Sequence, residues 1–429
     1  IAVRLELGYI FVKDVKFAAK TELKDGVVYV NKAELLAAMA DERLSRLDLD
    51  IVHPGESVRI CPVKDVLEPR VKVSGNGQVF PGFFDDAKTV GEGRTHVLKG
   101  MGVMTVGKIV GFQEGIVDMT GPGADYTPFS QLINLVILAD KVDGLLQHEH
   151  EAALRMVGLK ATRYIAEVAR TAEPDQVKVY ETKPLQEQLL EYPELPQVAY
   201  VYALQTQGLM HDSYLYAVDA KKILPTMIYP TEVMDGAIVS GNCVSACDKN
   251  TTYHHLNSPV IYDLYDHHGK DLNFVGVVIS NENVTLLDKE RSSNYAAKLV
   301  KSLGVDGVII SEEGFGNPDA DLIMNCKKIE AEGIKTVLIT DEYAGRDGAS
   351  QSLADGHDLA NAVVSGGNAN ALITLPKLDK IIGYVDAVNV IAGGFDGALA
   401  GDGSITVEIQ AITGATNELG FNKMGGAGI

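Results

Sequence analysis

The second half of the chain alternates apolar strands with helical stretches, and this alternation restricts the fold more than any other feature. Phe274–Ile279 is an uninterrupted apolar run, which is typical of a strand buried on both faces. A helical stretch at Arg291–Leu303 leads to a second apolar strand at Gly307–Ile310. A further helix at Asp319–Glu332 leads to a third strand at Thr336–Ile339. This order predicts a doubly wound, mostly parallel sheet.

The first half has a different pattern, which predicts a β-rich α+β arrangement. The pair Asp25-Gly26 joins two short strands as a hairpin, and Asn31 caps the helix that follows. Further on we expect strands near Gly107–Gln113, one long helix near Glu149–Ala172 and a strand at Gln197–Leu204. The fold class is therefore α/β, with a β-rich first half and a C-terminal doubly wound sheet.

Composition excludes several functions. The chain has 429 residues and a formal net charge of −20, which argues against nucleic acid and anionic membranes as partners. No apolar stretch reaches the roughly 18–20 residues that span a bilayer. Four cysteines in a chain of this length do not form a disulfide framework, so we expect a reduced, cytoplasmic protein.

The loops after the predicted strands offer no nucleotide site. Gly314-Phe315-Gly316 lacks the third glycine of a dinucleotide fingerprint, and no phosphate cradle opens a helix. The acidic pairs Glu312-Glu313 and Asp341-Glu342 follow strand ends, where ligands gather in such sheets. These carboxylates either orient a substrate ammonium group or line the mouths of the loops.

The segment Ser240–Asp248 contains a peptide bond with unusual chemical potential. Cys243 directly follows Asn242, and its thiol is within reach of the Asn242 carbonyl group. Attack on that carbonyl converts the peptide bond into a thioester, and elimination from the thioester cuts the chain. The new chain then begins with a group derived from Cys243, which is itself a candidate catalyst.

Other interpretations of the two cysteines in this segment stay open. Cys243 and Cys247 are four residues apart and suit buried core positions or two ligands of a zinc ion. The pairs His254-His255 and His267-His268 follow, but adjacent histidines point apart on any regular element. The motif His148–Glu151 also looks metal-binding, and we interpret it as a solvated helix terminus.

The whole segment Ser240–Asp248 resembles the processing site of component B of the glycine, sarcosine and betaine reductases. The resemblance is to the proprotein that yields the two non-selenium subunits. It extends to Arg4–Gly8, to the strand Val27–Lys32, to the loop Gly367–Asn370 and to the total length. The resemblance therefore covers essentially the whole chain.

The resemblance implies cleavage before Cys243 and conversion of this residue into a covalent pyruvoyl group. Fragments 1–242 and 243–429 would be the two subunits, and the cut falls between the two sequence patterns described above. The pyruvoyl carbonyl would hold the amino-acid substrate as a Schiff base. A selenocysteine on a partner subunit would displace the amine and keep a carboxymethyl selenoether. The further partners implied are a carrier selenoprotein, component A, and an acetyl-phosphate-forming component C.

Several neighbours are candidate helpers in cleavage by their proximity in sequence alone. A base is needed to increase the thiolate fraction of Cys243, and Asp248, His254 and His255 are candidates. Cys247 is either structural or a second thiol near the site. We expect neither a nucleotide nor a metal.

The substrate and the reaction class each keep alternatives. Glycine and sarcosine carry a nitrogen that forms an imine or iminium, whereas the quaternary nitrogen of betaine does not. Glycine is therefore the first choice of substrate. The alternatives to a reductase of anaerobic amino-acid fermentation are a pyruvoyl-dependent amino-acid decarboxylase and a zinc-stabilised, non-catalytic scaffold that uses Cys243 and Cys247.

Overall fold

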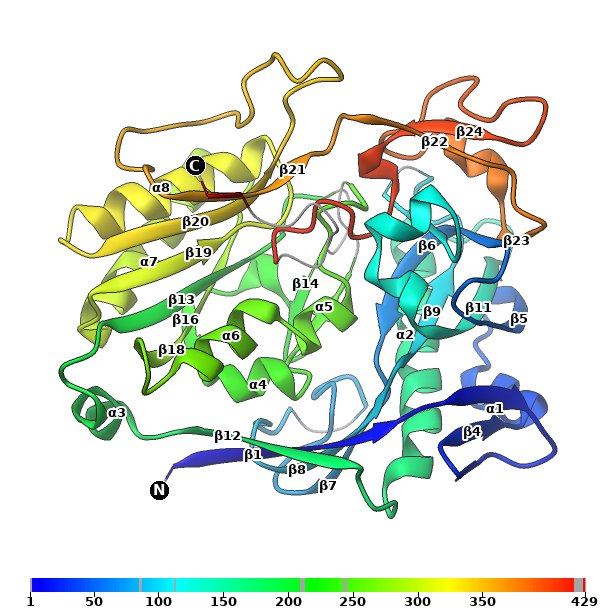
Figure 1. Ribbon diagram of the computed structural model, residues 1–429, viewed down its shortest axis with the longest axis horizontal. Helices are drawn as coiled ribbons and strands as arrows, with labels where there is room; N and C mark the ends of the chain where they lie inside the picture. Colours follow the sequence, from blue (N-terminus) through cyan, green and yellow to red (C-terminus); the bar gives the residue numbers. More distant parts are fainter. Residues whose placement is uncertain are drawn as a thin grey trace.

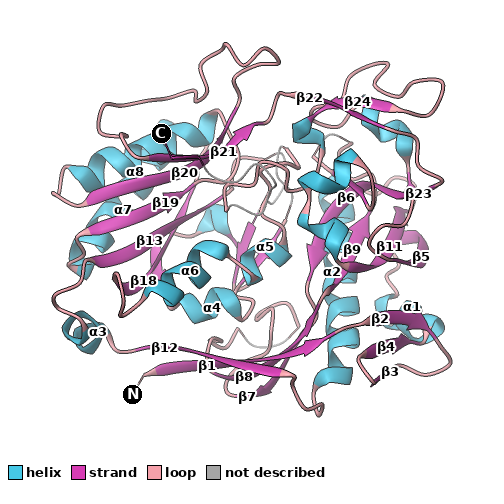
Figure 2. Cartoon of the chain, viewed as in Figure 1, coloured by secondary structure: helices cyan, strands magenta, loops and turns pink. Residues whose placement is uncertain are grey.

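A parallel sheet and two β-rich layers make up the protein (Figure 1). The computed structural model describes residues 2–84, 87–111, 113–208, 213–241, 245–419 and 427–428. The parallel sheet lies on the left of Figure 2, and sheets from the first part of the chain lie on the right and below. None of the helices formed by the described residues combines the length and the apolar character that a membrane span requires.

The sheet on the left has the strand order β16-β18-β13-β19-β20-β21-β25. Strand β13 pairs in parallel with β18 and β19, and β20 extends the parallel run to β21. The edge strands β16 and β25 are antiparallel. The strands of this sheet are β13 (Gln197–Leu204), β16 (Thr226–Ile228), β18 (Asn273–Asn281), β19 (Gly307–Ser311), β20 (Lys335–Glu342), β21 (Val363–Asn368) and β25 (Ala427–Gly428).

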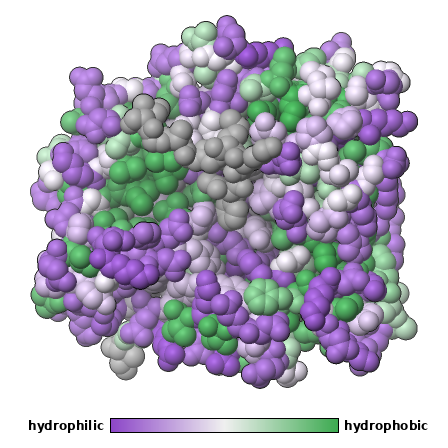
Figure 3. Space-filling view, in the orientation of Figure 1, coloured by the Kyte–Doolittle hydropathy of each residue, from purple (hydrophilic) through white to green (hydrophobic). Residues whose placement is uncertain are grey.

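Each face of this sheet has its own core. Tyr200 and Tyr202 of β13 pack in a core that includes α6 (Pro259–His267). Ala199 and Val201 point the other way and pack with α7 (Leu286–Leu303) and α8 (Asn317–Glu330). Burial on both faces explains the uninterrupted apolar run of β18. Figure 3 shows a largely hydrophilic face of the molecule with an apolar patch over this sheet.

Two larger sheets come mainly from the first part of the chain. One has the order β10-β6-β9-β11-β5 and the other β12-β1-β8-β7. Helix α1 (Lys32–Met39) and the long helix α2 (Gln147–Ala166) pack on a core shared with these strands. The strands are β1 (Val3–Phe11), β5 (Leu44–Val52), β6 (Val58–Leu67), β7 (Arg70–Ser74), β8 (Gly93–Lys99), β9 (Met101–Val106), β10 (Gly115–Asp118), β11 (Ile133–Lys141) and β12 (Gln176–Thr182).

Smaller elements complete the fold. Strands β2, β4 and β3 form one small sheet, β15, β14 and β17 form another, and β22 pairs with β24. Two short helices, α3 and α4, connect larger elements. Their bounds are β2 (Asp14–Phe17), β3 (Glu22–Lys24), β4 (Val27–Val30), α3 (Leu185–Glu191), β14 (Ser213–Leu215), β15 (Val218–Asp219), α4 (Pro230–Met234), β17 (Ile238–Ser240), β22 (Leu372–Leu375) and β24 (Ile405–Glu408).

Most of the local predictions are confirmed, and one is wrong. The hairpin turns at Asp25-Gly26, where both residues have positive φ, and the Asn31 side chain accepts hydrogen bonds from the first turn of α1. The predicted strands near Gly107–Gln113 are absent from the described residues of that range. The flanking strands β9 and β10 pair with β6 instead, and the described residues between them form no strand.

Strands from either side of residue 242 share sheets. β13 belongs to residues 1–242, yet it lies between β18 and β19, which belong to residues 243–429. Conversely, β23 (Lys380–Gly383) belongs to residues 243–429, yet it pairs with β6 of residues 1–242. The division at residue 242 stays a prediction about the processed protein, and in the intact chain the two ranges are interleaved.

We therefore expect fragments 1–242 and 243–429 to stay together after any cut between them. Separating them breaks the hydrogen bonds on both sides of β13 and exposes the apolar residues of that strand. Both fragments should elute together in native size-exclusion chromatography, at the volume of an uncut Cys243→Ala chain, and should separate in denaturant. Separate elution under native conditions would contradict this expectation.

Candidate functional site

The predicted cleavage residues Asn242 and Cys243 lie outside the described residues, and the structure describes the chain on both sides of them. Strand β17 leads toward them, and Gly241 at its end is buried. On the other side Ser245 and Cys247 are buried as well. The flanks of the predicted cleavage bond therefore lie inside the protein.

Two lysine side chains hold the backbone just before this bond. The Nζ atom of Lys249 donates a hydrogen bond to the carbonyl oxygen of Gly241 at 2.9 Å. It donates a second one to the carbonyl oxygen of Lys64. The Lys64 ammonium group itself donates to the carbonyl oxygen of Ser240 at 3.4 Å. Two buried positive charges thus contact successive backbone carbonyls.

The Lys64 side chain is held by helix α2. Its Nζ atom lies 3.3 Å from Oε1 of Glu151, which also pairs with Arg155 one turn along the helix. Burial lowers the pKa of Lys64 to about 8, and the negative charge of Glu151 opposes that shift. Burial acts to raise the pKa of Glu151, but the charges of Lys64 and Arg155 hold it below its usual value.

This ion pair corrects the interpretation of His148–Glu151 as a solvated helix terminus. His148 and Glu149 are exposed, but His150 and Glu151 are buried. Alternate residues at a helix start point in different directions, and the side chain of Glu151 turns toward β6. The sequence offered no sign that its partner Lys64 would be buried there.

Cys247 and Asp248 lie beside a carboxyl group at the end of β20. The Sγ atom of Cys247 is 3.9 Å from Oδ2 of Asp341 and 3.3 Å from the Tyr343 hydroxyl. One ligand atom each of Cys247, Asp248 and Asp341 lies within 4.8 Å of the others. One sulfur and two carboxylates are a donor set that suits a divalent cation such as zinc.

Burial also controls the protonation of this group. It raises the pKa of Asp248 to about 8, and the negative charge of Glu313 adds to the shift. Burial likewise raises the pKa of the Cys247 thiol well above its usual value. Unless a cation binds between them, the thiol and the Asp248 carboxyl are mainly protonated at neutral pH.

More carboxyl groups surround the residues that follow the predicted cleavage bond. Glu313, which follows β19, accepts a hydrogen bond from the Asn250 N–H group at 2.9 Å, and Glu418 accepts one from the Asn250 side chain. Burial raises the pKa of Glu313 to about 7 and that of Glu418 well above its usual value. Glu313 lies at the carboxyl end of a parallel strand, as predicted. Glu312, Glu313 and Asp341 are buried, so they do not line open loop mouths.

The two candidate histidines lie on α5 (Thr252–Leu256), which packs between β17 and β6. His255 Nδ1 is 2.6 Å from the Tyr202 hydroxyl, and His254 Nδ1 is 2.9 Å from Oγ1 of Thr251. Burial lowers the pKa of His255 to about 3 and that of His254 well below its usual value. Both imidazoles are therefore neutral at pH 7, and burial makes them weaker bases than an exposed histidine.

The second histidine pair, considered earlier as zinc ligands, lies at the end of α6. His267 pairs with Asp271, and His268 accepts a hydrogen bond from the Phe274 N–H group at 3.1 Å. The structure thus brings Cys247 and Asp248 next to Asp341, and it gives His267 and His268 other partners.

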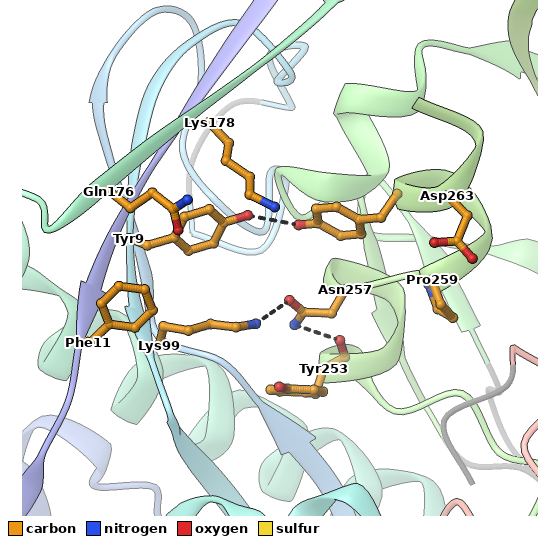
Figure 4. A pocket seen from close by; sticks show the side chains of 10 residues that line it. Tyr9, Phe11, Lys99, Gln176, Lys178, Tyr253, Asn257, Pro259 and Asp263 are labelled. Carbon is orange, nitrogen blue, oxygen red and sulfur yellow. Dashed lines mark hydrogen bonds between the residues drawn. The ribbon is translucent and has the colours of Figure 1, made fainter. Parts of the chain in front are cut away.

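An open pocket of about 370 Å³ lies beside another face of α5 (Figure 4). Tyr253 and Asn257 line it from that helix, and Tyr9 and Lys99 line it from the opposite strands. Lys99 donates a hydrogen bond to the Asn257 side chain at 2.9 Å. No described residue of the segment 240–248 lines this pocket.

The raised pKa of Asp248 leads to a testable pH dependence. The folded protein keeps this proton up to about pH 8, whereas an unfolded chain releases it near the usual pKa of about 4. Between these values the folded state binds more protons, so rising pH favours unfolding. The asparagine side chain of the Asp248→Asn variant cannot ionise. As the pH rises from about 5 to about 8, the thermal midpoint of this variant should therefore fall less than that of the wild type.

Asp263→Asn is the matched control, because it also removes a carboxyl group, but an exposed one that lines the open pocket. It should show the same pH dependence of the thermal midpoint as the wild type. If Asp248→Asn also showed the wild-type dependence, the protonated state assigned to Asp248 would be wrong.

Comparison with known proteins places the chain in a family. The family model of the glycine/sarcosine/betaine reductase component B subunits matches residues 3–427. The chain is 70% identical to the glycine reductase complex component B subunits alpha and beta of Acetoanaerobium sticklandii, over 98% of this chain and 99% of the relative.

Two proteins of Peptoclostridium acidaminophilum are also similar. The chain is 64% identical to its glycine reductase complex component B subunits alpha and beta, over 99% of this chain and 100% of the relative. It is 58% identical to the sarcosine reductase complex component B subunit alpha of the same organism, over 98% of this chain and 99% of the relative. No solved structure matches the chain. The chain belongs to the glycine/sarcosine/betaine reductase component B family and is thus an oxidoreductase component.

Proposed function

We propose that this chain is a proprotein that cuts itself between Asn242 and Cys243 and supplies two subunits of a glycine reductase component B. One observation carries the proposal. Glycine reductase relatives that are 70% and 64% identical over nearly the whole chain are each named as alpha and beta subunits within a single sequence. A single sequence that supplies two subunits needs a cut, and the Asn242–Cys243 bond has the chemistry for it.

In this proposal the residue that becomes the prosthetic group is Cys243. A pyruvoyl group supplies an electrophilic carbonyl, which takes up the amine of the substrate as a Schiff base. The described surroundings fit such a group, because the chain on both sides is buried and lies among groups that exchange protons. Asp248 and Glu313 have pKa values of about 8 and about 7, so both can hold or release a proton near neutral pH.

Glycine is the substrate that we propose. The two glycine reductase relatives are more similar to the chain than the sarcosine reductase relative, at 70% and 64% against 58% identity. The substrate must also carry a nitrogen that can bond to a carbonyl carbon, which glycine and sarcosine do. The chemistry excludes the quaternary nitrogen of betaine from this step.

We propose further that the chain works with a selenocysteine-containing subunit of component B, with the carrier selenoprotein component A and with the acetyl-phosphate-forming component C. The names of the relatives, which are components of a reductase complex, support an assembly of this kind. The selenocysteine would displace the amine reductively and keep the carboxymethyl group. A cytoplasmic location in an anaerobic organism agrees with the free thiols of Cys61, Cys247 and Cys326.

The intact mass of the native protein tests the cut. We expect two fragments, 1–242 and 243–429, with the second blocked to N-terminal sequencing because its first residue has become a pyruvoyl group. A Cys243→Ala chain should stay full length, because it has no thiol. A single full-length native species with a free thiol at Cys243 would refute the proposal, and zinc bound to that species would favour the scaffold alternative.

Reductive trapping tests the substrate. With isotopically labelled glycine and cyanoborohydride, the label should enter fragment 243–429, whereas labelled betaine should leave it unlabelled. Release of ammonia should require the selenocysteine subunit. Carbon dioxide released from glycine by the isolated chain would instead favour the decarboxylase alternative.

A further inference from the structure

Asp248 differs from the other fully buried aspartates of the described chain in its partners. It is 1% exposed, yet neither oxygen of its carboxyl group has a hydrogen-bond partner among the described residues. The Tyr343 hydroxyl lies near it, but outside hydrogen-bond geometry. The other aspartates that are at most 2% exposed each accept a hydrogen bond from an N–H or hydroxyl group of the protein. They are Asp65, Asp118, Asp235, Asp319, Asp321 and Asp341.

A buried carboxyl group without a partner is costly, and a water molecule or an ion is the usual compensation. The surroundings of Asp248 add negative charge, because the carboxyl groups of Glu313 and Asp341 act on it. One oxygen of Asp341 also has no hydrogen-bond partner within the described chain. Lys249, the next residue, directs its ammonium group to backbone carbonyls instead. What these carboxyl groups lack is therefore a positive charge.

The donor atoms around Asp248 are already close to the spacing of a metal site. One ligand atom each of Cys247, Asp248 and Asp341 lies within 4.8 Å of the others, and Sγ of Cys247 is 3.9 Å from Oδ2 of Asp341. Zinc binds sulfur at about 2.3 Å and carboxylate oxygen at about 2.0–2.2 Å in a tetrahedral arrangement, so two such donors are about 3.5–3.7 Å apart. The observed distance between sulfur and oxygen is only slightly longer.

We propose that Cys247, Asp248 and Asp341 bind one divalent cation of the zinc type, each through one atom, and that a water molecule fills the fourth position. The sulfur ligand favours zinc over magnesium or calcium, which take oxygen ligands. A bound cation keeps the thiolate and both carboxylates ionised. The protonation and the pH dependence described above for Asp248 are therefore those of the cation-free protein. The zinc scaffold considered from the sequence uses Cys243, which this site does not need.

Two hydroxyl groups hold the proposed ligands in place. Thr416 is buried and donates a hydrogen bond to Oδ2 of Asp341. The Tyr343 hydroxyl is 3.3 Å from Sγ of Cys247. Outer partners of this kind orient metal ligands. The Tyr343 ring stacks on Phe315, and both residues are partly exposed, so the site lies one layer of side chains below the surface. All these residues follow the proposed cleavage bond in sequence, so the inference does not depend on the cut.

The test measures zinc bound to the uncut Cys243→Ala chain, in which neither cleavage nor the Cys243 thiol can contribute. This parent chain is stripped with a chelator under anaerobic conditions, loaded with zinc chloride, desalted and analysed for its metal content by mass spectrometry. We expect one zinc ion per chain. In the same background, Cys247→Ser and Asp341→Asn each remove a ligand. Their zinc affinity, measured in competition with a chelating dye, should fall by more than the roughly 10–100-fold loss that an outer partner causes.

Two further variants of the parent chain make the measurement specific. Thr416→Val keeps all three ligands and removes one outer hydrogen bond, so the zinc affinity should fall by about 10–100-fold. Cys326→Ser is the matched control, since it also removes a buried thiol, but one in α8 that contacts Thr336. It should bind zinc as the parent does. With cobalt(II) in place of zinc, the parent and Cys326→Ser should show the absorption of a thiolate–cobalt bond, and Cys247→Ser should lack it.

Added zinc should raise the thermal midpoint of the parent chain but not that of Asp341→Asn, because an ion that binds only the folded state stabilises it. A stripped parent that retains no zinc would overturn the inference, and so would undiminished zinc affinity in Asp341→Asn. If Asp341→Asn did not fold, parental affinity in both Cys247→Ser and Thr416→Val would overturn it.

Two outcomes separate this inference from the other proposals. Zinc bound by the wild type but not by the Cys243→Ala chain would overturn the inference, because Cys243 would then be a ligand, as in the zinc scaffold. An uncut wild type that binds zinc through Asp341 would overturn only the proposed function and would support the metal site.

Discussion

The pairing of β13 with β18 on one side and β19 on the other is the constraint on which the site depends. It inserts a strand from before residue 242 into the middle of a sheet whose other parallel strands follow that residue. The carboxyl ends of the parallel strands then meet at one edge. Gln205, Glu282 and Glu313 follow those ends, Asp341 lies at the end of β20, and the segment from Ser245 to Asn250 packs among them.

The electrostatics of this edge follow from burial. Carboxyl groups such as Asp248, Glu313 and Glu418 are closed off from water, and burial keeps them protonated to a higher pH than usual. A neutral acid can donate a hydrogen bond or a proton, whereas an ionised one would repel its neighbours. Lys249 brings a positive charge into this surrounding, and the attraction between that charge and Glu313 moderates the shift of the Glu313 pKa.

The sequence allowed the architecture of the second half to be predicted well, because parallel strands buried on both faces produce long apolar runs. β18, β19 and β20 all lie where these runs are, and α7 and α8 lie between them. The central place of β13 could not be predicted, because strand order is set by contacts between distant residues and not by local pattern. The prediction of strands between β9 and β10 was wrong, because the apolar residues Ile109 and Val110 contribute to a hydrophobic core without pairing in a sheet.

The candidate site was predictable in part for a similar reason. Cys247 and Asp248 could be chosen because they are neighbours of Cys243 in sequence, and the acidic pairs because they follow predicted strands. Lys64 and Glu151 are far from the segment in sequence, and only the folded chain joins them to Ser240. Lys249 directly follows Asp248 in the sequence, but nothing in the sequence distinguishes a buried charge from a solvated one.

These long-range contacts form only in the folded chain. Lys249 reaches the backbone of Lys64, 185 residues earlier in the chain, and that contact exists only when β6 and α5 have packed together. A chain that has not folded therefore has no positive charge fixed at the Gly241 carbonyl. In the folded, uncut chain, residues on the two sides of position 242 are already interleaved through β13 and β23. The fold thus places a positive charge against the backbone that precedes the proposed cleavage bond, and it forms the sheets that we expect to keep the two fragments together.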